Sequence, residues 1–188
     1  MLYTKKGDDG KTKIFGCDQR LSKSSTIAEA LGTLDEVNSF LGLCRAKIAN
    51  QDSVLKSKTE NVLDYAEVIF EIQNNLFTIQ AQVASADKKI SEKEIEKIEK
   101  TMEDIEKVIP KVKSFIIPGS CEVSALFDYA RTLVRASERR VVAVSEENFV
   151  KIDSNSLRYL NRLSSFFFAL ARHNAYKSGI NEVSPIYK

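Results

Sequence analysis

Glycine and proline are scarce in this sequence, with seven and three among 188 residues. Sandwiches and barrels need many turns, and turns depend on these two residue types, so the scarcity favours long helices. No apolar run approaches the roughly 20 residues that a membrane-spanning helix requires. The first nine residues also lack the apolar stretch of a signal peptide. We therefore expect a cytoplasmic protein that makes no contact with a membrane.

Histidine and cysteine are also rare. The single histidine, His173, excludes the paired Glu-x-x-His motifs of di-iron bundles and disfavours histidine-based triads and zinc sites. The cysteines, Cys17, Cys44 and Cys121, are odd in number and widely spaced, which argues against a disulfide framework and a structural zinc site. An enzyme with this composition would have to work without histidine acid–base chemistry.

Positive and negative charges are nearly balanced. The chain has 28 basic and 26 acidic residues, a formal net charge of +2, and no basic arm. This balance gives no reason to expect a nucleic-acid partner. Hydrophobic residues make up 43% and charged residues 29%, as in an ordinary globular domain. We expect one domain over 1–188, with an N-terminal loop at 1–24, a helical bundle at 25–179 and a tail at 180–188.

Apolar residues recur at steps of three and four through most of the chain, which predicts helices. The first follows an N-cap at Ser24 or Ser25, and the others span 53–85, 91–108, 121–147 and 154–177. Ser91 and Glu94 have the spacing of a capping box, and the narrow apolar stripe after them places the third helix on the outside of the bundle. The triplet Phe166-Phe167-Phe168 makes the last helix apolar nearly all round, so it should lie at the bundle centre or in a subunit interface.

The N-terminal loop carries glycines at Gly7 and Gly10 around two aspartates, with lysines and threonines on either side. Glycines allow a backbone to approach an anion closely, so the loop could cradle phosphate. The same composition is common in an ordinary polar turn, and composition alone favours the turn.

Three arginines, Arg131, Arg135 and Arg139, are spaced four apart and therefore share one helix face. The guanidinium fork binds oxyanions in a bidentate manner, which suits polyphosphate. The alternative is a salt-bridged face between helices, and Glu138 is placed to pair with Arg135. These two interpretations are evenly balanced.

Two amides, Asn38 and Asn161, interrupt otherwise apolar helical stripes. A buried amide left unpaired costs roughly 1–3 kcal/mol, so each needs a partner, which can be a neighbouring group or a ligand. Asp35 lies one turn before Asn38 and could pair with an arginine of the fourth helix, in the same chain or in a neighbour.

Several segments together resemble one family. They are Tyr-Thr-x-x-Gly-Asp-Asp-Gly-x-Thr at 3–12, Glu-Ala-Leu-Gly-Thr-Leu-Asp-Glu-Val-Asn-Ser at 29–39, Phe-Ile-Ile-Pro-Gly at 115–119, Ala-Arg-Thr at 130–132 with the arginines of 135–140, and Tyr-Leu-Asn-Arg-Leu-Ser at 159–164. Their content and order are similar to those of PduO-type ATP:cob(I)alamin adenosyltransferases. The resemblance implies an all-α, ferritin-like five-helix bundle that moves the adenosyl group of ATP to cob(I)alamin.

The resemblance also implies a homotrimer with active sites between subunits. ATP would be held by the N-terminal loop residues Thr4, Lys5, Lys6, Gly7, Thr12 and Lys23. The adjacent subunit would complete the nucleotide site with Arg131, Arg135, Glu138, Arg139 and Asn161. Asp35 would pair with Arg131 across the interface, and Phe115 would face the corrin.

The implied substrates are ATP and cobalamin, with Mg²⁺ held mainly by the ATP phosphates. A cob(II)alamin reductase and a B12-dependent enzyme are the expected protein partners. Three positions depart from the family pattern: Ala136 replaces an arginine, Ser165 an aspartate and Cys17 a glycine. The main alternative is a helical bundle that binds ATP or cobalamin without catalysis, as a sensor or carrier.

Overall fold

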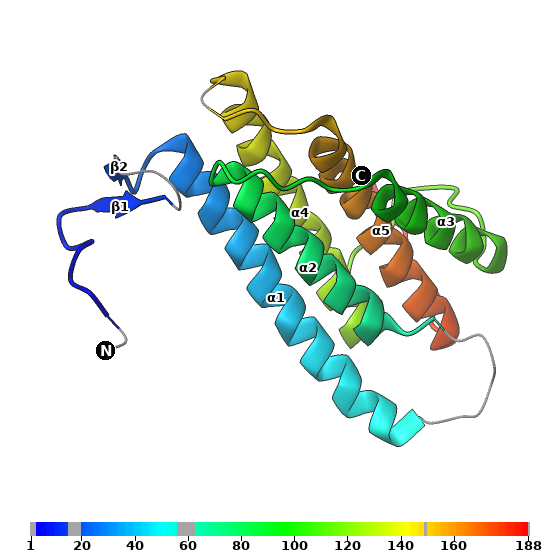
Figure 1. Ribbon diagram of the computed structural model, residues 1–188. Coiled ribbons are helices and arrows are strands. Elements are labelled where there is room, and N and C mark those ends of the chain that lie inside the picture. Colours follow the sequence, from blue (N-terminus) through cyan, green and yellow to red (C-terminus); the bar gives the residue numbers. More distant parts are fainter. Residues whose placement is uncertain (1–2, 15–19, 56–62, 149, 188) are drawn as a thin grey trace.

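The computed structural model describes residues 3–14, 20–55, 63–148 and 150–187. Five helices form an elongated bundle (Figure 1). They are α1 (Thr26–Leu55), α2 (Tyr65–Val83), α3 (Glu92–Val108), α4 (Glu122–Glu146) and α5 (Ser154–Lys177). The predicted five-helix, mainly α fold is thus confirmed.

The predicted second helix, 53–85, was wrong at its beginning. The structure extends α1 to Leu55 and begins α2 only at Tyr65, because Asp64 caps it by accepting a hydrogen bond from the amide of Glu67 at 3.0 Å. At the other end, Ser85 has a φ of 70°, which is incompatible with a continuing helix. The first helix begins as expected, since the hydroxyl of Ser25 accepts from the amide of Ala28 at 3.4 Å.

The predicted capping box at α3 was also wrong. Ser91 occupies the N-cap position, but its side chain makes no capping hydrogen bond. The carboxylate of Glu94 instead accepts a hydrogen bond from Asn75 of α2 at 3.0 Å. A tertiary partner therefore replaces the local one. The expected outer position of α3 agrees with the structure, in which α3 packs mainly on α5 (Figure 1).

Composition predicted that the N-terminal segment is a loop throughout, and this prediction was wrong in part. The segment contains a short antiparallel hairpin of β1 (Lys11–Lys13) and β2 (Arg20–Ser22), with Thr12 opposite Leu21. This hairpin lies beyond the first turn of α1, on the side of the bundle away from α3 (Figure 1). Cys17 falls outside the described residues.

The helices pack so that α4 contacts both α1 and α5, while α2 contacts α1. Phe166 and Phe167 of α5 are 1% and 0% exposed, and Phe168 is half-buried. The apolar girth of α5 is therefore buried between α4 and α3, which agrees with the first of the two predicted positions, the bundle interior. Within the described part of the chain, no helix is long and apolar enough to cross a membrane.

His173 is a buried packing residue of α5. Its Nδ1 lies 2.7 Å from the hydroxyl of Tyr65, and the two rings meet edge to face. Burial lowers the pKa of His173, and the charge of Lys177 lowers it further. The folded protein therefore favours the neutral imidazole more than the unfolded chain does.

We expect the protein to lose stability as the pH falls through the usual histidine pKa of about 6.5, because the unfolded chain then binds a proton that the folded chain rejects. His173→Gln can keep a hydrogen bond to Tyr65 but cannot titrate. Urea unfolding between pH 7.5 and pH 5 should therefore show a shallower loss of unfolding free energy in the variant. Equal slopes would contradict the assignment.

Candidate functional site

The chain connecting α3 to α4, residues 109–121, forms a pocket of about 620 Å³ together with α4 and α5. The pocket brings together three of the predicted site residues, Phe115, Arg131 and Arg135. The rest of its lining is mostly apolar or hydroxylic: Val112, Ser114, Ile116, Ser164, Ser165 and Phe168. The lining therefore combines apolar surface with two cationic side chains, which suits a ligand that is partly apolar and partly anionic.

The connector holds Phe115 outside the protein core. Pro110 follows the last turn of α3, and Pro118 limits the conformations of the chain before α4. Gly119 adopts a φ of 98°, a conformation that favours glycine, and its amide donates to Asp128 of α4 at 2.9 Å. The Phe115 side chain is 78% exposed. Phe115 is therefore not part of the bundle core.

The arginine row lies along α4 as the spacing predicted. Arg131 is half-buried, and its Nε is buried without a hydrogen-bond partner among the described residues. Arg135 and Arg139 are exposed, and Arg139 donates to the carbonyl oxygen of Arg135 at 2.9 Å. None of the three forms an ion pair with another described residue. The salt-bridged alternative therefore finds no support within one subunit, and an unpaired buried donor beside two cations suits an anionic ligand.

Asp128 lies close to this row. Burial raises its pKa, although the Gly119 amide and the charge of Arg131 act in the opposite direction. The carboxylate of Asp128 accepts from the amide of Gly119 and so fixes the end of the connector to α4, the helix that bears the arginines.

Glu138 and Asn161 meet between α4 and α5. Asn161 donates to Glu138 at 2.9 Å and accepts from Arg162 at 3.0 Å. The expected pairing of Glu138 with Arg135 is absent among the described residues, and Oε1 of Glu138 accepts from Asn161 instead. Asn161 is exposed, so its prediction as a buried amide was wrong. The two residues form a polar, accessible pair one turn beyond Arg135.

On α1, Asn38 is buried and donates to the carbonyl oxygen of Gln73 at 3.3 Å, while its Oδ1 has no partner among the described residues. A neighbouring helix thus supplies one half of the pairing that a buried amide requires. Asp35 is exposed and makes no ion pair with Arg131 inside one subunit. A pairing of Asp35 with Arg131 would have to form between subunits.

The N-terminal loop is a tight turn that is fixed by cations. Arg20 binds the carboxylate of Asp9 with both guanidinium branches at 2.9 Å. The pKa of Asp9 is lowered, mainly by a hydrogen bond from the Lys11 amide and also by the hydrogen bonds and charge of Arg20. Lys23 donates to the carbonyl oxygen of Gly7 at 2.9 Å. A methyl group added at Gly7 would lie 3.1 Å from the Lys23 amine, so the flexible lysine side chain would have to shift slightly to admit a larger residue. The loop is therefore a turn, as its composition indicated. It holds the amine of Lys23 beside the backbone of Gly7.

The remaining predicted ligands of this loop, Thr4, Lys5 and Lys6, are exposed, and Thr12 is half-buried in β1. None of the described loop residues, 3–14 and 20–24, lines the 620 Å³ pocket. One subunit therefore presents the two halves of the predicted nucleotide site separately.

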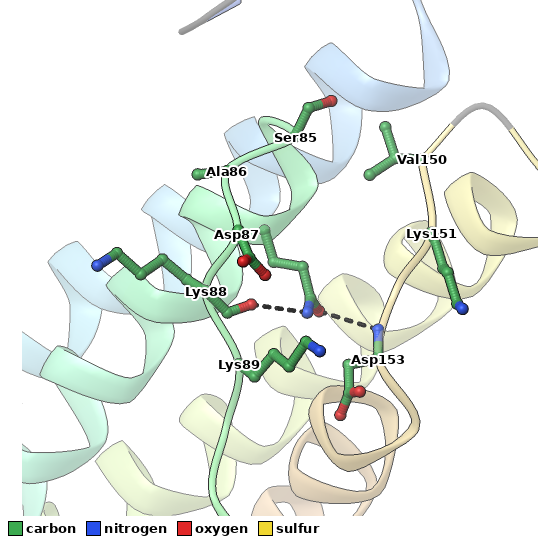
Figure 2. A pocket seen from close by; sticks show the side chains of 9 residues that line it. Ser85, Ala86, Asp87, Lys88, Lys89, Val150, Lys151 and Asp153 are labelled. Carbon is green, nitrogen blue, oxygen red and sulfur yellow. Dashed lines mark hydrogen bonds between the residues drawn. The ribbon is translucent and has the colours of Figure 1, made fainter.

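A second pocket of about 470 Å³ lies at the end of α2 and contains none of the predicted site residues. Gln82 is one of its lining residues; it donates to the carbonyl oxygen of Lys88 at 2.8 Å and accepts from the amide of Asp153 at 3.2 Å, and both bonds are drawn in Figure 2. The amines of Lys88 and Lys151 point away from each other (Figure 2). Gln82 therefore ties two loops together, and its polar groups are satisfied by the protein itself.

Sequence reasoning missed several residues of the site. Arg20 orders the N-terminal loop, and Ile116, Ser164 and Phe168 line the pocket. Ile116 and Ser164 stand inside quoted motifs, which was an available signal. Phe168 offered none, because helical periodicity does not show which residue of an aromatic triplet reaches a cavity.

The model of the family described as Cobalamin adenosyltransferase matches residues 2–174. A corrinoid adenosyltransferase from Bacillus subtilis (strain 168) is 37% identical over 182 residues, which are 97% of this chain and 90% of the relative. The corrinoid adenosyltransferase PduO of Citrobacter freundii is 35% identical over 95% of this chain, which spans about half of that relative, 52%.

The fold is likewise similar to that of a solved protein. A variant of the PduO-type ATP:corrinoid adenosyltransferase from Lactobacillus reuteri, complexed with cobalamin and ATP, superposes with a TM-score of 0.84 at 30% identity. The match covers 98% of this chain and 96% of the other. The resemblance found in the sequence is confirmed over nearly its whole length.

Proposed function

The chain belongs to the cobalamin adenosyltransferase family, and we propose that it transfers the 5′-deoxyadenosyl group of ATP to cob(I)alamin, giving adenosylcobalamin and triphosphate. The observation that carries this proposal is the pocket in which Phe115 lies beside the unpaired guanidinium groups of Arg131 and Arg135. Its apolar wall suits the corrin, and its cationic wall suits the polyphosphate.

The reaction needs little from the protein beyond position and charge. The Co(I) centre of the substrate supplies an electron pair to the 5′ carbon of ATP, the bond from that carbon to the phosphate oxygen breaks, and triphosphate leaves with the bonding electrons. No proton has to be removed from the nucleophile, which agrees with a single histidine that is buried against Tyr65. Arg131, Arg135 and Arg139 stabilise the charge that develops on the leaving group.

Mg²⁺ would lower the charge of the triphosphate further. Among the described residues, no group of three histidine, cysteine, aspartate or glutamate side chains could hold a metal ion. We therefore assign Mg²⁺ to the ATP phosphates, with Glu138 as an accessible carboxylate near the row.

A complete site requires a second subunit. The loop residues Thr4, Lys5, Lys6, Gly7, Thr12 and Lys23 do not reach the pocket of their own chain. In a homotrimer, the loop of one subunit would hold ATP against Arg131, Arg135, Glu138, Arg139 and Asn161 of the next. The exposed Asp35 and the partly unsatisfied Arg131 are available to pair across that interface.

We expect Asp35→Ala and Arg131→Ala each to weaken assembly and activity. An ion pair buried in an interface leaves one charge stranded when its partner is removed. A double-mutant cycle on trimer dissociation, followed by analytical ultracentrifugation, should show a coupling well above the roughly 0–1 kcal/mol of exposed pairs. Additive effects would mean that the two residues do not meet, and a stable wild-type monomer at micromolar concentration would rule out the shared site.

The proposed activity is tested by mixing anaerobic cob(I)alamin with ATP and recording the visible absorbance. Formation of adenosylcobalamin together with one equivalent of triphosphate is expected. ATP binding without formation of a cobalt–carbon bond would favour the alternative of a non-catalytic sensor or carrier. A cytoplasmic reductase for cob(II)alamin and a B12-dependent enzyme would supply the electron and receive the product.

A further inference from the structure

A buried ion pair joins α5 to the C-terminal tail. The Nε of Arg172 lies 2.9 Å from Oε2 of Glu182, and the two side chains are only 8% and 20% exposed. Arg172 also donates from Nη2 to the carbonyl oxygen of Pro110 at 2.9 Å. One guanidinium group therefore holds the tail and the beginning of the connector at the same point.

From this point the tail runs beside the connector. The amide of Ile117 donates to the carbonyl oxygen of Val183 at 2.8 Å, and the hydroxyl groups of Ser114 and Ser184 lie 2.6 Å apart. The other hydrogen bonds of the connector with described residues lie at its two ends, at Ile109, Gly119 and Cys121. Between residues 110 and 117, the tail and Arg172 supply the hydrogen bonds that the described residues make with the connector.

These contacts matter for the pocket because the connector carries its apolar wall. Phe115 is 78% exposed, so packing of its own side chain cannot fix its position. Ile116, Asp128, Arg131, Arg172 and Glu182 also line one small cavity of about 30 Å³. The ion pair consequently lies under the connector and next to the arginine of the predicted site.

We propose that the Arg172–Glu182 ion pair is a positioning element, which holds the C-terminal tail against the connector and thereby places Phe115 at the corrinoid side of the pocket. The inference rests on the proposed function and assigns the tail a part in it. Removing the charge of Glu182 should therefore impair use of the corrinoid and leave the affinity for ATP unchanged, because Arg131 only shares the small cavity and none of these hydrogen bonds involves Arg131, Arg135, Arg139 or the N-terminal loop.

The test is Glu182→Gln, which keeps the shape of the side chain and removes its charge. We expect kcat/KM for cob(I)alamin to fall about tenfold, since a small displacement of a positioning group is costly. We also expect a lower yield, in the presence of ATP, of four-coordinate cob(II)alamin, the form that has lost the lower axial ligand of its cobalt. The KM for ATP should stay the same. Glu92→Gln is the matched control, because Glu92 forms an exposed ion pair with Arg158 of the same helix α5, at 2.8 Å, away from the connector. It should change neither substrate's kinetics.

A Phe115→Ala background separates positioning from general damage. If the ion pair acts through Phe115, Glu182→Gln should cause no additional loss there. Additive losses, equal loss of ATP affinity, or unchanged corrinoid kinetics in folded Glu182→Gln would overturn the inference. If Glu182→Gln does not fold, Ser184→Ala removes a single contact between tail and connector at an exposed site, and an unchanged four-coordinate signal in that variant would equally overturn it. A wild-type protein that forms no adenosylcobalamin would instead refute the proposed function.

Discussion

Replacing Arg135 with alanine is expected to reduce kcat/KM for ATP by roughly 30- to 150-fold, the equivalent of a charge-assisted contact of about 2–3 kcal/mol. Arg135 lines the 620 Å³ pocket, is exposed to solvent and forms no ion pair with any described residue. Its loss therefore leaves no charge stranded in the protein. The free energy of unfolding should change by no more than about 0.5 kcal/mol, as at other surface positions.

Steady-state kinetics with varied ATP would measure the effect, and urea unfolding would establish that the fold survives. The kcat/KM of Arg135→Lys for ATP should lie between those of the wild type and Arg135→Ala, because an ammonium keeps the charge and loses the bidentate fork. Arg158→Ala is the matched control, since Arg158 pairs with Glu92 on the outer side of α5. Wild-type kinetics in folded Arg135→Ala would show that the arginine row has no part in ATP use.

The second large effect is expected at Phe115. A lower axial ligand on cob(II)alamin raises the energy of the orbital that receives the electron, so the site has to exclude that ligand before reduction. A bulky apolar side chain achieves this by filling the space and keeping water away. Phe115→Ala should therefore abolish most of the four-coordinate cob(II)alamin signal and lower turnover, while ATP affinity stays close to that of the wild type.

Stability separates this role from a packing role. Truncating a buried phenylalanine costs about 3–5 kcal/mol, whereas Phe115 is 78% exposed and should cost far less. Ile117→Ala is the matched control, because Ile117 belongs to the same connector, is 48% exposed and does not line the pocket. Magnetic circular dichroism of the variants with cob(II)alamin and ATP makes the comparison. An undiminished four-coordinate signal in Phe115→Ala would exclude Phe115 from the mechanism.

Apolar periodicity is a local property, and it predicted all five helices, although the second begins at Tyr65 and not at 53. The last helix was predicted at 154–177, the bounds that α5 has, and in the structure Asp153 caps it by accepting a hydrogen bond from the amide of Asn155. The arginine row followed from spacing alone, and the ordered motifs identified the family. Errors arose where a local signal met a tertiary competitor: Glu94 could cap α3, but Asn75 from α2 binds its carboxylate.

Which of these residues meet depends on the packing of the whole chain. Packing brings Phe115 of the connector to Arg131 and Arg135 of α4, and it keeps the described part of the N-terminal loop away from them. It turned Asn161 toward Glu138 and tied the tail to the connector through Arg172 and Glu182. Such contacts join segments far apart in the chain, and their geometry depends on how whole helices pack against each other. Periodicity gives the face of a helix, and only packing decides what that face meets.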